Sequence, residues 1–228
     1  MDLNGKKVVI TGANGGLGRA VAQSCAELGA SLVLLDIAFS ENDTAANSDQ
    51  RQCIALDLCD LNACQRCFAE IGSFDALFNL AGGFGMGTAT HSDDDSEWDF
   101  MFKINVATLR NAVKAAVPIL LEQGKGKIVN VGALGAVQGG AMMSAYSASK
   151  SVVMRLTESL SGELRDQGIN VNAVLPSVID TAQNREAMPD VDPATWVAPT
   201  DLANVICFLG SDAANAVHGA LVPVRGLS

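Results

Sequence analysis

Short apolar runs alternate with helix-like periods along the whole chain. Helical spacing of apolar residues first shows in Leu17, Val21 and Cys25. Further helix-like segments lie near 61–71, from the acidic run at 93–99 to about Gly124, at 144–167 and from Pro199 onward. The strand-like runs lie at 7–11, 31–36, 53–57, 75–83, 127–133, 169–175 and 220–224. Continuous apolar strands that alternate with helices predict a parallel sheet covered on both faces.

This pattern predicts an α/β fold in which residues 1–228 form a single domain with a doubly wound, Rossmann-type parallel sheet. The length of 228 residues agrees with one domain of this kind. The segment 40–50 is rich in turn formers and is predicted as a surface excursion. The loop-rich insertion at 176–198 is interpreted as a substrate loop, with a short helix and a packing tryptophan as the alternative.

Charge and composition narrow the classes of partner. Fifteen basic and twenty-five acidic residues give a net charge of −10, which argues against nucleic acid as a partner. The longest uncharged stretch, Ile128–Ser149, contains polar and glycine residues, so we expect no membrane span. The first residues, MDLNGKK, have no apolar run of signal-peptide length, and we expect a cytoplasmic protein. Cys64 and Cys67 form a CxxC without a second pair, so no metal site is predicted.

A glycine cluster follows the first predicted strand and opens the first predicted helix. The segment TGANGGLG, residues 11–18, has the context in which a backbone approaches a pyrophosphate. Asp36 ends the second strand, 18 residues after Gly18, where a carboxylate can accept hydrogen bonds from the adenosine ribose. The same carboxylate would repel a 2′-phosphate, and neither the loop before Arg19 nor residues 37–39 supplies a cation. NAD(H) is therefore predicted over NADP(H).

Tyr146 and Lys150 lie four residues apart, so they share one face of a predicted helix. An ammonium beside a phenol favours the phenolate, and we expect the pKa of Tyr146 to be lowered toward neutral for proton exchange with a substrate. A solvent-exposed Tyr/Lys pair is the alternative explanation of this spacing alone.

Together these motifs resemble the short-chain dehydrogenases/reductases over nearly the whole chain. The match comprises TGANGGLG, the strand end at Asp36, Asp57-Leu58, NLAG at 79–82, Asn105, YSASK at 146–150 and PSVIDT at 176–181. The resemblance implies that Tyr146 is the acid/base, that Lys150 holds the nicotinamide ribose and that Asn105 anchors a relay water. The cofactor-binding residues that it implies or that the motifs indicate are Thr11, Gly12, Asn14, Gly16, Leu17, Gly18, Asp36, Asp57, Leu58, Asn79, Ala81, Gly82, Tyr146, Lys150, Pro176, Ile179 and Thr181.

One position departs from the family pattern. The family usually has a serine thirteen residues before the tyrosine, where its hydroxyl polarises the substrate carbonyl, and this chain has Ala133. Losing such a donor costs about 10²–10³ in rate. Three explanations stay open: a weakened enzyme, replacement by another hydroxyl such as Ser144, or a substrate that needs no such donor.

Within the family, the dihydropteridine reductases are similar in having alanine at this position. Further similar segments are AGGFGMG at 81–87, VGALGAVQGGAMMSAY at 131–146 and LPSVIDTAQNREAMPDVDPATW at 175–196. A quinonoid dihydropterin is an electron-poor imine system that accepts hydride without a serine-polarised carbonyl. Besides Ala133 and Ser144, Met188 and Trp196 are predicted substrate contacts.

The predicted function is hydride transfer between NAD(H) and a small-molecule substrate, with Tyr146 as the acid/base and a quinonoid dihydropterin as the leading substrate. The alternatives are a carbonyl, alcohol or 3-oxoacyl reductase or dehydrogenase of the same family, and a catalytically weak NAD(H)-binding sensor or scaffold. By resemblance, the helices near 99–122 and 148–166 are pairing faces, and a homo-oligomer, dimer or tetramer, is expected.

Overall fold

Seven parallel strands form one sheet at the centre of the computed structural model, which describes residues 1–227. Their order is β3-β2-β1-β4-β5-β6-β7, so the chain reverses its direction of travel across the sheet between β1 and β4. This reversal leaves a crevice at the carboxyl ends of the strands, where α/β sheets bind ligands. The strands are β1 (Lys7–Thr11), β2 (Ser31–Asp36), β3 (Arg51–Ala55), β4 (Ala76–Asn79), β5 (Gly126–Val131), β6 (Ile169–Pro176) and β7 (Leu221–Val224).

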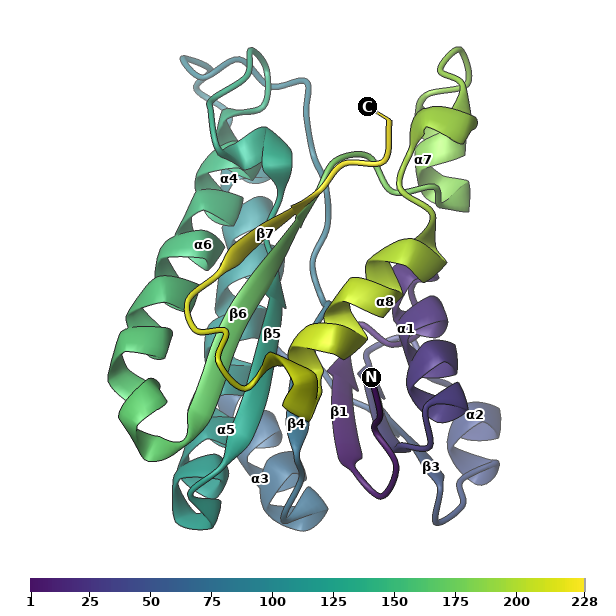
Figure 1. Ribbon diagram of the computed structural model, residues 1–228. Helices are drawn as coiled ribbons and strands as arrows, with labels where there is room; N and C mark the ends of the chain where they lie inside the picture. The colour runs from purple at the N-terminus through teal and green to yellow at the C-terminus, as the bar shows by residue number, and fades with distance from the viewer. Residues whose placement is uncertain (228) are drawn as a thin grey trace.

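Helices connect the strands and cover both faces of the sheet (Figure 1). They are α1 (Gly16–Glu27), α2 (Glu41–Ala45), α3 (Leu61–Ile71), α4 (Ser96–Phe102), α5 (Thr108–Gln123), α6 (Ser144–Leu164), α7 (Ala182–Ala187) and α8 (Pro199–Gly210). A π-helical turn at Lys103–Ala107 joins α4 to α5, and 3₁₀ turns occur at Leu134–Ala136, Arg165–Gln167, Pro193–Thr195 and Asp212–Ala214.

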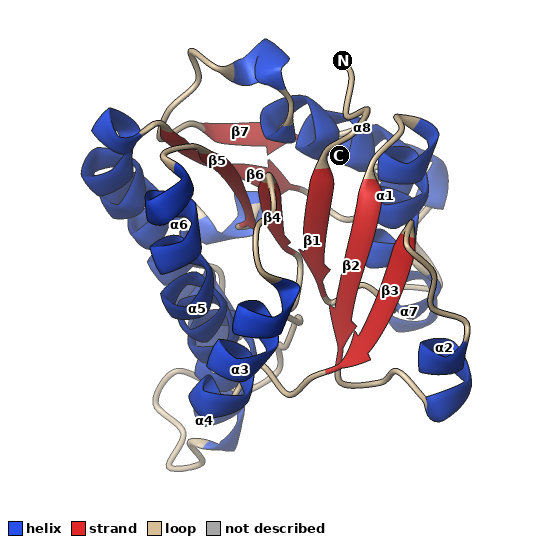
Figure 2. Cartoon of the chain, turned by 90° about the horizontal axis from the view of Figure 1, so that it is seen from below, coloured by secondary structure: helices blue, strands red, loops and turns tan. Residues whose placement is uncertain are grey.

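The two faces of the sheet bury separate apolar clusters. Figure 2, seen from below, places α3, α5 and α6 on one side of the strands and α1 and α8 on the other. On the α1/α8 side, Val21 and Cys25 of α1 pack against Ile206 and Cys207 of α8. On the other side, apolar residues of α3 and α5 cover β4 and β5. The predicted doubly wound α/β architecture is confirmed.

Three local predictions need correction. The third strand was placed at 53–57 and lies at Arg51–Ala55, because it pairs with Leu32–Asp36 of β2 in that register. The turn-rich segment 40–50 contains the short helix α2, which a capping box between Ser40 and Asp43 begins. The long helical period before Gly124 is divided into α4, the π-turn and α5.

Within residues 1–227, one helical run, Ser96–Gln123, is long and apolar enough to cross a membrane by length and composition alone. Half of its most apolar window is buried inside the fold. Ala112, Ala116 and Leu120 of α5 belong to the core beneath the sheet, and a core helix passes the same test.

Candidate active site

A cavity of about 1350 Å³ opens at the carboxyl ends of the strands. It brings together sixteen of the residues that the sequence analysis singled out for the cofactor or the substrate. These are Gly12, Gly16, Leu17, Gly18, Asp36, Asp57, Leu58, Ala81, Gly82, Ala133, Tyr146, Lys150, Pro176, Ile179, Thr181 and Met188. Six others do not line it: Thr11, Asn14, Asn79, Asn105, Ser144 and Trp196.

The glycine-rich segment is shaped by close backbone packing. Gly12 has φ +65°, and a Cβ there would lie 2.7 Å from the backbone nitrogen of Ala81. A Cβ on Gly18 would lie only 2.2 Å from the carbonyl oxygen of Gly12. Only glycine fits these two positions without moving the backbone.

The start of α1 fits a phosphate-bearing cofactor. Gly15 is the N-cap residue and offers no side-chain acceptor, so the first amide groups of this twelve-residue helix have no side-chain cap. Gly15 and Gly16 line the cavity beside these amides. Backbone N–H groups and the positive end of the helix dipole favour an anion such as a pyrophosphate.

Thr11 and Asn79 organise the backbone beside the cavity instead of lining it. The Thr11 hydroxyl, which is buried, accepts hydrogen bonds from the amides of Leu80 (3.1 Å) and Ala81 (3.2 Å). The Asn79 side chain donates to Asn130 Oδ1 at 2.9 Å between β4 and β5. Thr11 therefore acts on the cavity through the position of residues 80–81 rather than through its own surface.

Asp36 lines the cavity at the end of β2. Its carboxylate accepts hydrogen bonds from the backbone amides of Asn14 and Ala38, both at 2.9 Å. Arg19 lies in the same neighbourhood, because its Nη2 donates to Asn14 Oδ1 at 3.0 Å. Neither the loop before Arg19 nor residues 37–39 contains a cation, and Arg19 itself reaches this loop only through Asn14.

Tyr146 and Lys150 lie one turn apart on α6 and both line the cavity. Lys150 is buried, and its Nζ donates to the carbonyl oxygen of Val131 at 3.0 Å. The ring of Phe84 packs edge-on against Tyr146, with 4.8 Å between the ring centroids. The predicted pair therefore faces a shared internal space and is not a solvent-exposed pair.

Burial, rather than their mutual charge, governs the protonation of this pair. It raises the pKa of Tyr146 to about 12 and lowers the pKa of Lys150 to about 8. The direction for Tyr146 is opposite to the expected lowering, because removal from water disfavours the phenolate. At neutral pH Tyr146 is a neutral phenol and Lys150 is mostly an ammonium.

Asn105 lies in the π-turn behind the cavity. Its Oδ1 accepts from the amide of Gly83 at 2.9 Å, while its Nδ2 donates to the carbonyl oxygen of Gly83 at 3.1 Å and to Ser149 Oγ at 3.1 Å. A Cβ on Gly82 would lie 2.6 Å from Asn105 Oδ1 and 3.2 Å from Lys150 Nζ. Asn105 therefore fixes the 82–83 backbone next to Lys150.

Ser144 does not take the place of the missing serine at position 133 in the cavity lining. Ala133 lines the cavity and packs in a small apolar cluster with Tyr146 and Leu175. Ser144, the predicted substitute, is the first residue of α6 and does not line the cavity. The region beside Tyr146 thus presents a methyl group where the family usually presents a hydroxyl.

Methionines and aromatic residues form the outer part of the cavity. Met86, Met143 and Met188 contribute flexible apolar side chains, and Phe84 and Phe100 contribute rings. Phe84, Phe100 and Met86 were not individually predicted as lining residues. For Phe84 and Met86 the available signal was the similarity of the 81–87 segment to one subfamily. These five side chains supply a large apolar part of the cavity lining, here called the apolar wall.

The 176–198 segment divides into a part that lines the cavity and a part that packs. Thr181 accepts from the amide of Asn184 to begin α7, and Arg185 Nη2 donates to Asp180 Oδ2 at 2.8 Å. Met188 faces the cavity, whereas Trp196 is buried away from it. Trp196 is therefore a packing residue, which was the alternative to a substrate contact, because its side chain is buried in the core and does not line the cavity.

Metal ligands do not gather among residues 1–227: no three His, Cys, Asp or Glu side chains come together. Cys64 and Cys67 are buried on α3, and burial raises the pKa of each thiol to about 11. Both side chains belong to the apolar cluster beneath the sheet.

The geometry is that of a dinucleotide-binding α/β protein with a tyrosine–lysine pair at the end of its cofactor cleft. Residues 6–192 match the family model described as short chain dehydrogenase. The chain belongs to this family and is an oxidoreductase.

Some of the similar proteins are named as dehydrogenases of sugar acids. The 2-keto-3-deoxy-L-fuconate dehydrogenase of Xanthomonas campestris is 31% identical over 95% of this chain and 78% of its own length. The 2-dehydro-3-deoxy-D-gluconate 5-dehydrogenase of Escherichia coli is 30% identical, covering 98% of this chain and 95% of its own. A solved structure of a candidate 2-deoxy-D-gluconate 3-dehydrogenase from Agrobacterium tumefaciens with bound NADP has a TM-score of 0.87 at 33% identity. The match covers 99% of this chain and 96% of that one.

Proposed function

We propose that this protein is an NAD(H)-dependent reductase in which Tyr146 supplies the proton. The observation that carries the proposal is a neutral, partly buried phenol in the same cavity as an uncapped helix N-terminus. Because burial keeps Tyr146 protonated at neutral pH, it is suited to donating a proton. Reduction of the substrate is therefore the favoured direction.

The preference for NAD(H) rests on Asp36. Both of its oxygens already accept backbone amides, which fixes the carboxylate at the site where the adenosine ribose would lie. A ribose diol can donate to it, whereas a 2′-phosphate meets a negative charge. Arg19 is linked to this region through Asn14, and a relative has NADP bound, so the test compares both cofactors.

Tyr146, Lys150 and Asn105 have different roles near the position of hydride transfer. A bound nicotinamide supplies the hydride. Tyr146 donates its phenolic proton to the substrate atom that gains charge, and the Lys150 ammonium, held by Val131, stabilises the phenolate that results. Asn105 holds the 82–83 backbone against Lys150, and the proposed relay water would join this network.

The leading substrate is a quinonoid dihydropterin. Its conjugated imine system takes up the hydride and the proton as new N–H bonds, so it does not need the hydroxyl that polarises a carbonyl and that Ala133 lacks. The apolar wall of Met86, Met143 and Met188 with Phe84 and Phe100 suits a flat conjugated ring.

A second candidate is oxidation or reduction of a small hydroxy or oxo acid. Arg225 lines the same cavity and carries a charge that can pair with a carboxylate. The names of the similar sugar-acid dehydrogenases point in the same direction. For this class the methyl of Ala133 is a handicap in polarising the carbonyl.

The test measures oxidation of NADH and of NADPH with a quinonoid dihydropterin generated in place, beside a panel of oxo acids and simple carbonyls. Non-enzymatic reduction is subtracted. We expect turnover with the pterin, faster with NADH, and a loss of about 10²–10⁴ in kcat for Tyr146→Phe. The phenylalanine keeps the ring contact with Phe84, so NADH binding should be unchanged.

Each alternative has its own outcome. Turnover confined to oxo acids would replace the pterin with the second candidate. NADH binding without turnover on any substrate would favour a sensor or scaffold. Undiminished activity of Tyr146→Phe would remove Tyr146 as the proton donor.

A further inference from the structure

A second cavity, of about 420 Å³, lies at the opposite end of the sheet from the active site. Lys6 precedes β1, Asp75 precedes β4, and Lys127 and Asn170 are the second residues of β5 and β6. All lie at the amino ends of the strands. Lys127 is four residues from Val131, about 13 Å along the same strand.

The central feature is a buried cation with neutral partners. Lys127 is 8% exposed, and its Nζ donates to Asn170 Oδ1 at 2.8 Å and to Asn215 Oδ1 at 2.5 Å. Among the described residues, no carboxylate lies within 4 Å of this ammonium. Two amide oxygens satisfy two of its three N–H donors and none of its charge. Asp212 attracts this ammonium from beyond ion-pair distance and only partly offsets the cost of burying the charge, which an anion in the cavity would offset further.

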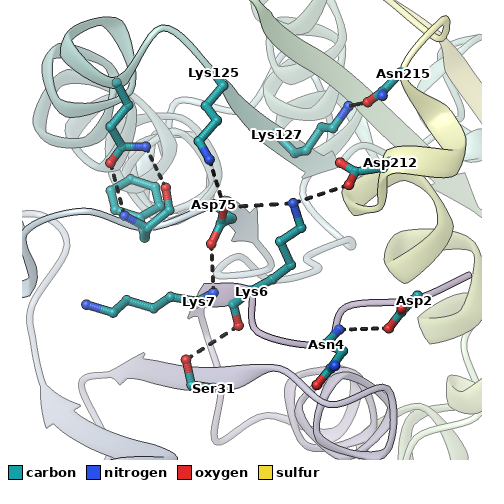
Figure 3. Close-up of polar contacts among 12 residues, drawn as sticks. Asp2, Asn4, Lys6, Lys7, Ser31, Asp75, Lys125, Lys127, Asp212 and Asn215 are labelled. Carbon is teal, nitrogen blue, oxygen red and sulfur yellow. Dashed lines mark hydrogen bonds and ion pairs between the residues drawn. The ribbon is translucent and has the colours of Figure 1, made fainter.

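Further cations surround Lys127 (Figure 3). Lys6 and Lys125 both point at Asp75, with N···O distances of 4.0 and 3.9 Å, and Lys6 also pairs with Asp212 at 3.3 Å. Asp75 is further held by the backbone amide of Lys7 at 2.9 Å, so it fixes the positions of the two lysines.

The cavity has a positive balance in a protein of net charge −10. Arg165 adds a fourth cation to Lys6, Lys125 and Lys127, against the carboxylates of Asp75 and Asp212. Asp166 lies 3.8 Å from Arg165 and does not line the cavity. The lining of the cavity therefore carries two more positive than negative charges. Burial and the neighbouring Lys6 lower the pKa of Lys127, Asp212 partly opposes that shift, and an anion in the cavity would oppose it further.

We infer that this cavity binds a small phosphate-bearing anion. Lysine ammonium groups are point charges suited to phosphate oxygens, and Arg165 adds a planar fork of donors. The volume lies within the range of small-molecule sites and exceeds what one phosphate group needs, so a phosphate ester or a diphosphate fits better than an inorganic monoanion.

The experiment titrates inorganic pyrophosphate into the protein by calorimetry and ³¹P NMR at fixed ionic strength. Saturating NAD⁺ is present, because the glycine-rich loop is a second place where pyrophosphate can bind. We expect one saturable site and a rise in melting temperature with pyrophosphate concentration. Citrate is titrated in parallel. Citrate binding as tight as pyrophosphate binding would overturn the phosphate assignment.

Variants locate the site. Lys125→Gln and Arg165→Gln change exposed side chains, and each should weaken binding about three- to tenfold. Asp212→Asn removes a negative charge from the rim and should tighten binding by a similar factor. Lys127→Gln should abolish pyrophosphate binding. Because this variant changes a buried group, its folding is checked first.

Lys114→Gln on α5 is the matched control, since it removes one positive charge from an exposed residue outside the cavity. It should leave pyrophosphate affinity unchanged. Equal affinities in Lys125→Gln, Arg165→Gln, Asp212→Asn and Lys114→Gln would overturn the inference, as would the absence of saturable binding to the wild type. These changes lie at the far end of the sheet, so their outcome is independent of the substrate and cofactor of the active site.

Discussion

The glycine wall of the active-site cavity, formed by Gly12, Gly16, Gly18 and Gly82, is made of backbone. The methionine wall, another part of the lining formed by Met86, Met143 and Met188, is made of side chains. Added methyl groups would collide with backbone at Gly12 and Gly18 and with the side chain of Asn105 at Gly82, and at Gly16 they would press on the side chain of Thr181. Met86, by contrast, is 56% exposed. A wall of packed backbone fits one ligand shape, whereas a wall of flexible side chains can change its rotamers to fit ligands of different shape. Cofactor binding should therefore be far less tolerant of substitution than substrate choice.

The largest effect is expected from Gly18→Ala. The new methyl group would lie 2.2 Å from the carbonyl oxygen of Gly12, so the start of α1 must move. We expect NADH affinity to fall more than a hundredfold and the melting temperature to drop, measured by fluorescence titration and circular dichroism. Gly162→Ala, in α6 with open space around its Cβ, is the control and should keep NADH affinity. Equal NADH affinity in Gly18→Ala and wild type would show that the glycine wall is not rigid.

The next largest effect is expected from Ala133→Ser, which changes a lining residue that belongs to neither wall and lies beside Tyr146. The added hydroxyl would face the cavity beside Tyr146, and activity on oxo acids and simple carbonyls should rise about tenfold or more. Activity on a conjugated imine should change little. Ala136→Ser places a hydroxyl in the same apolar cluster but outside the cavity lining, and it should bring no gain. A large gain on the imine substrate would contradict the role assigned to Ala133.

Asp36→Ser is expected to shift cofactor preference by about tenfold toward NADPH in kcat/KM. The substitution removes the carboxylate that opposes a 2′-phosphate and leaves Arg19 nearby. Adding Arg19→Gln should reverse most of this gain, because it removes the remaining cation. Kinetics with both cofactors at saturating substrate provide the measurement. An unchanged NADPH/NADH ratio in Asp36→Ser would place the selectivity elsewhere.

Met188→Ala should give the smallest change, a rise in substrate KM of a few-fold with kcat nearly constant. The side chain lines the cavity from the end of α7 and contributes apolar contact only. Met142→Ala is the matched control, since Met142 is 42% exposed and does not line the cavity. A loss of kcat in Met188→Ala would assign that residue a part in the chemistry.

The sequence predicted the sheet and most of the glycine wall because both follow local rules. Apolar runs mark buried strands, and glycines at the first strand–helix turn mark a close backbone approach. Side-chain direction was harder to predict. Thr11 and Asn79 are polar residues at strand ends, yet their side chains bond to residues 80–81 and to Asn130, which are distant in sequence.

The direction of the Tyr146 pKa and the basic cavity depend on tertiary structure. Spacing on α6 places Lys150 beside Tyr146, but it does not indicate how completely both are removed from water. Lys6, Lys125 and Arg165 come from three separate connections, and only the strand order β1-β4-β5-β6 brings them to one cavity. No local pattern in the chain marks such a convergence.

The π-turn at Lys103–Ala107 also sets how this segment tolerates changes in length. A π-turn contains one residue more per hydrogen-bonded ring than an α-turn. Deleting a single residue there would let α4 continue into α5 as one regular helix and would remove the widened turn that positions Asn105. Asn105 would then leave Gly83, and the loop beside Lys150 would lose its anchor. Chain length at this one point is therefore as constrained as side-chain identity.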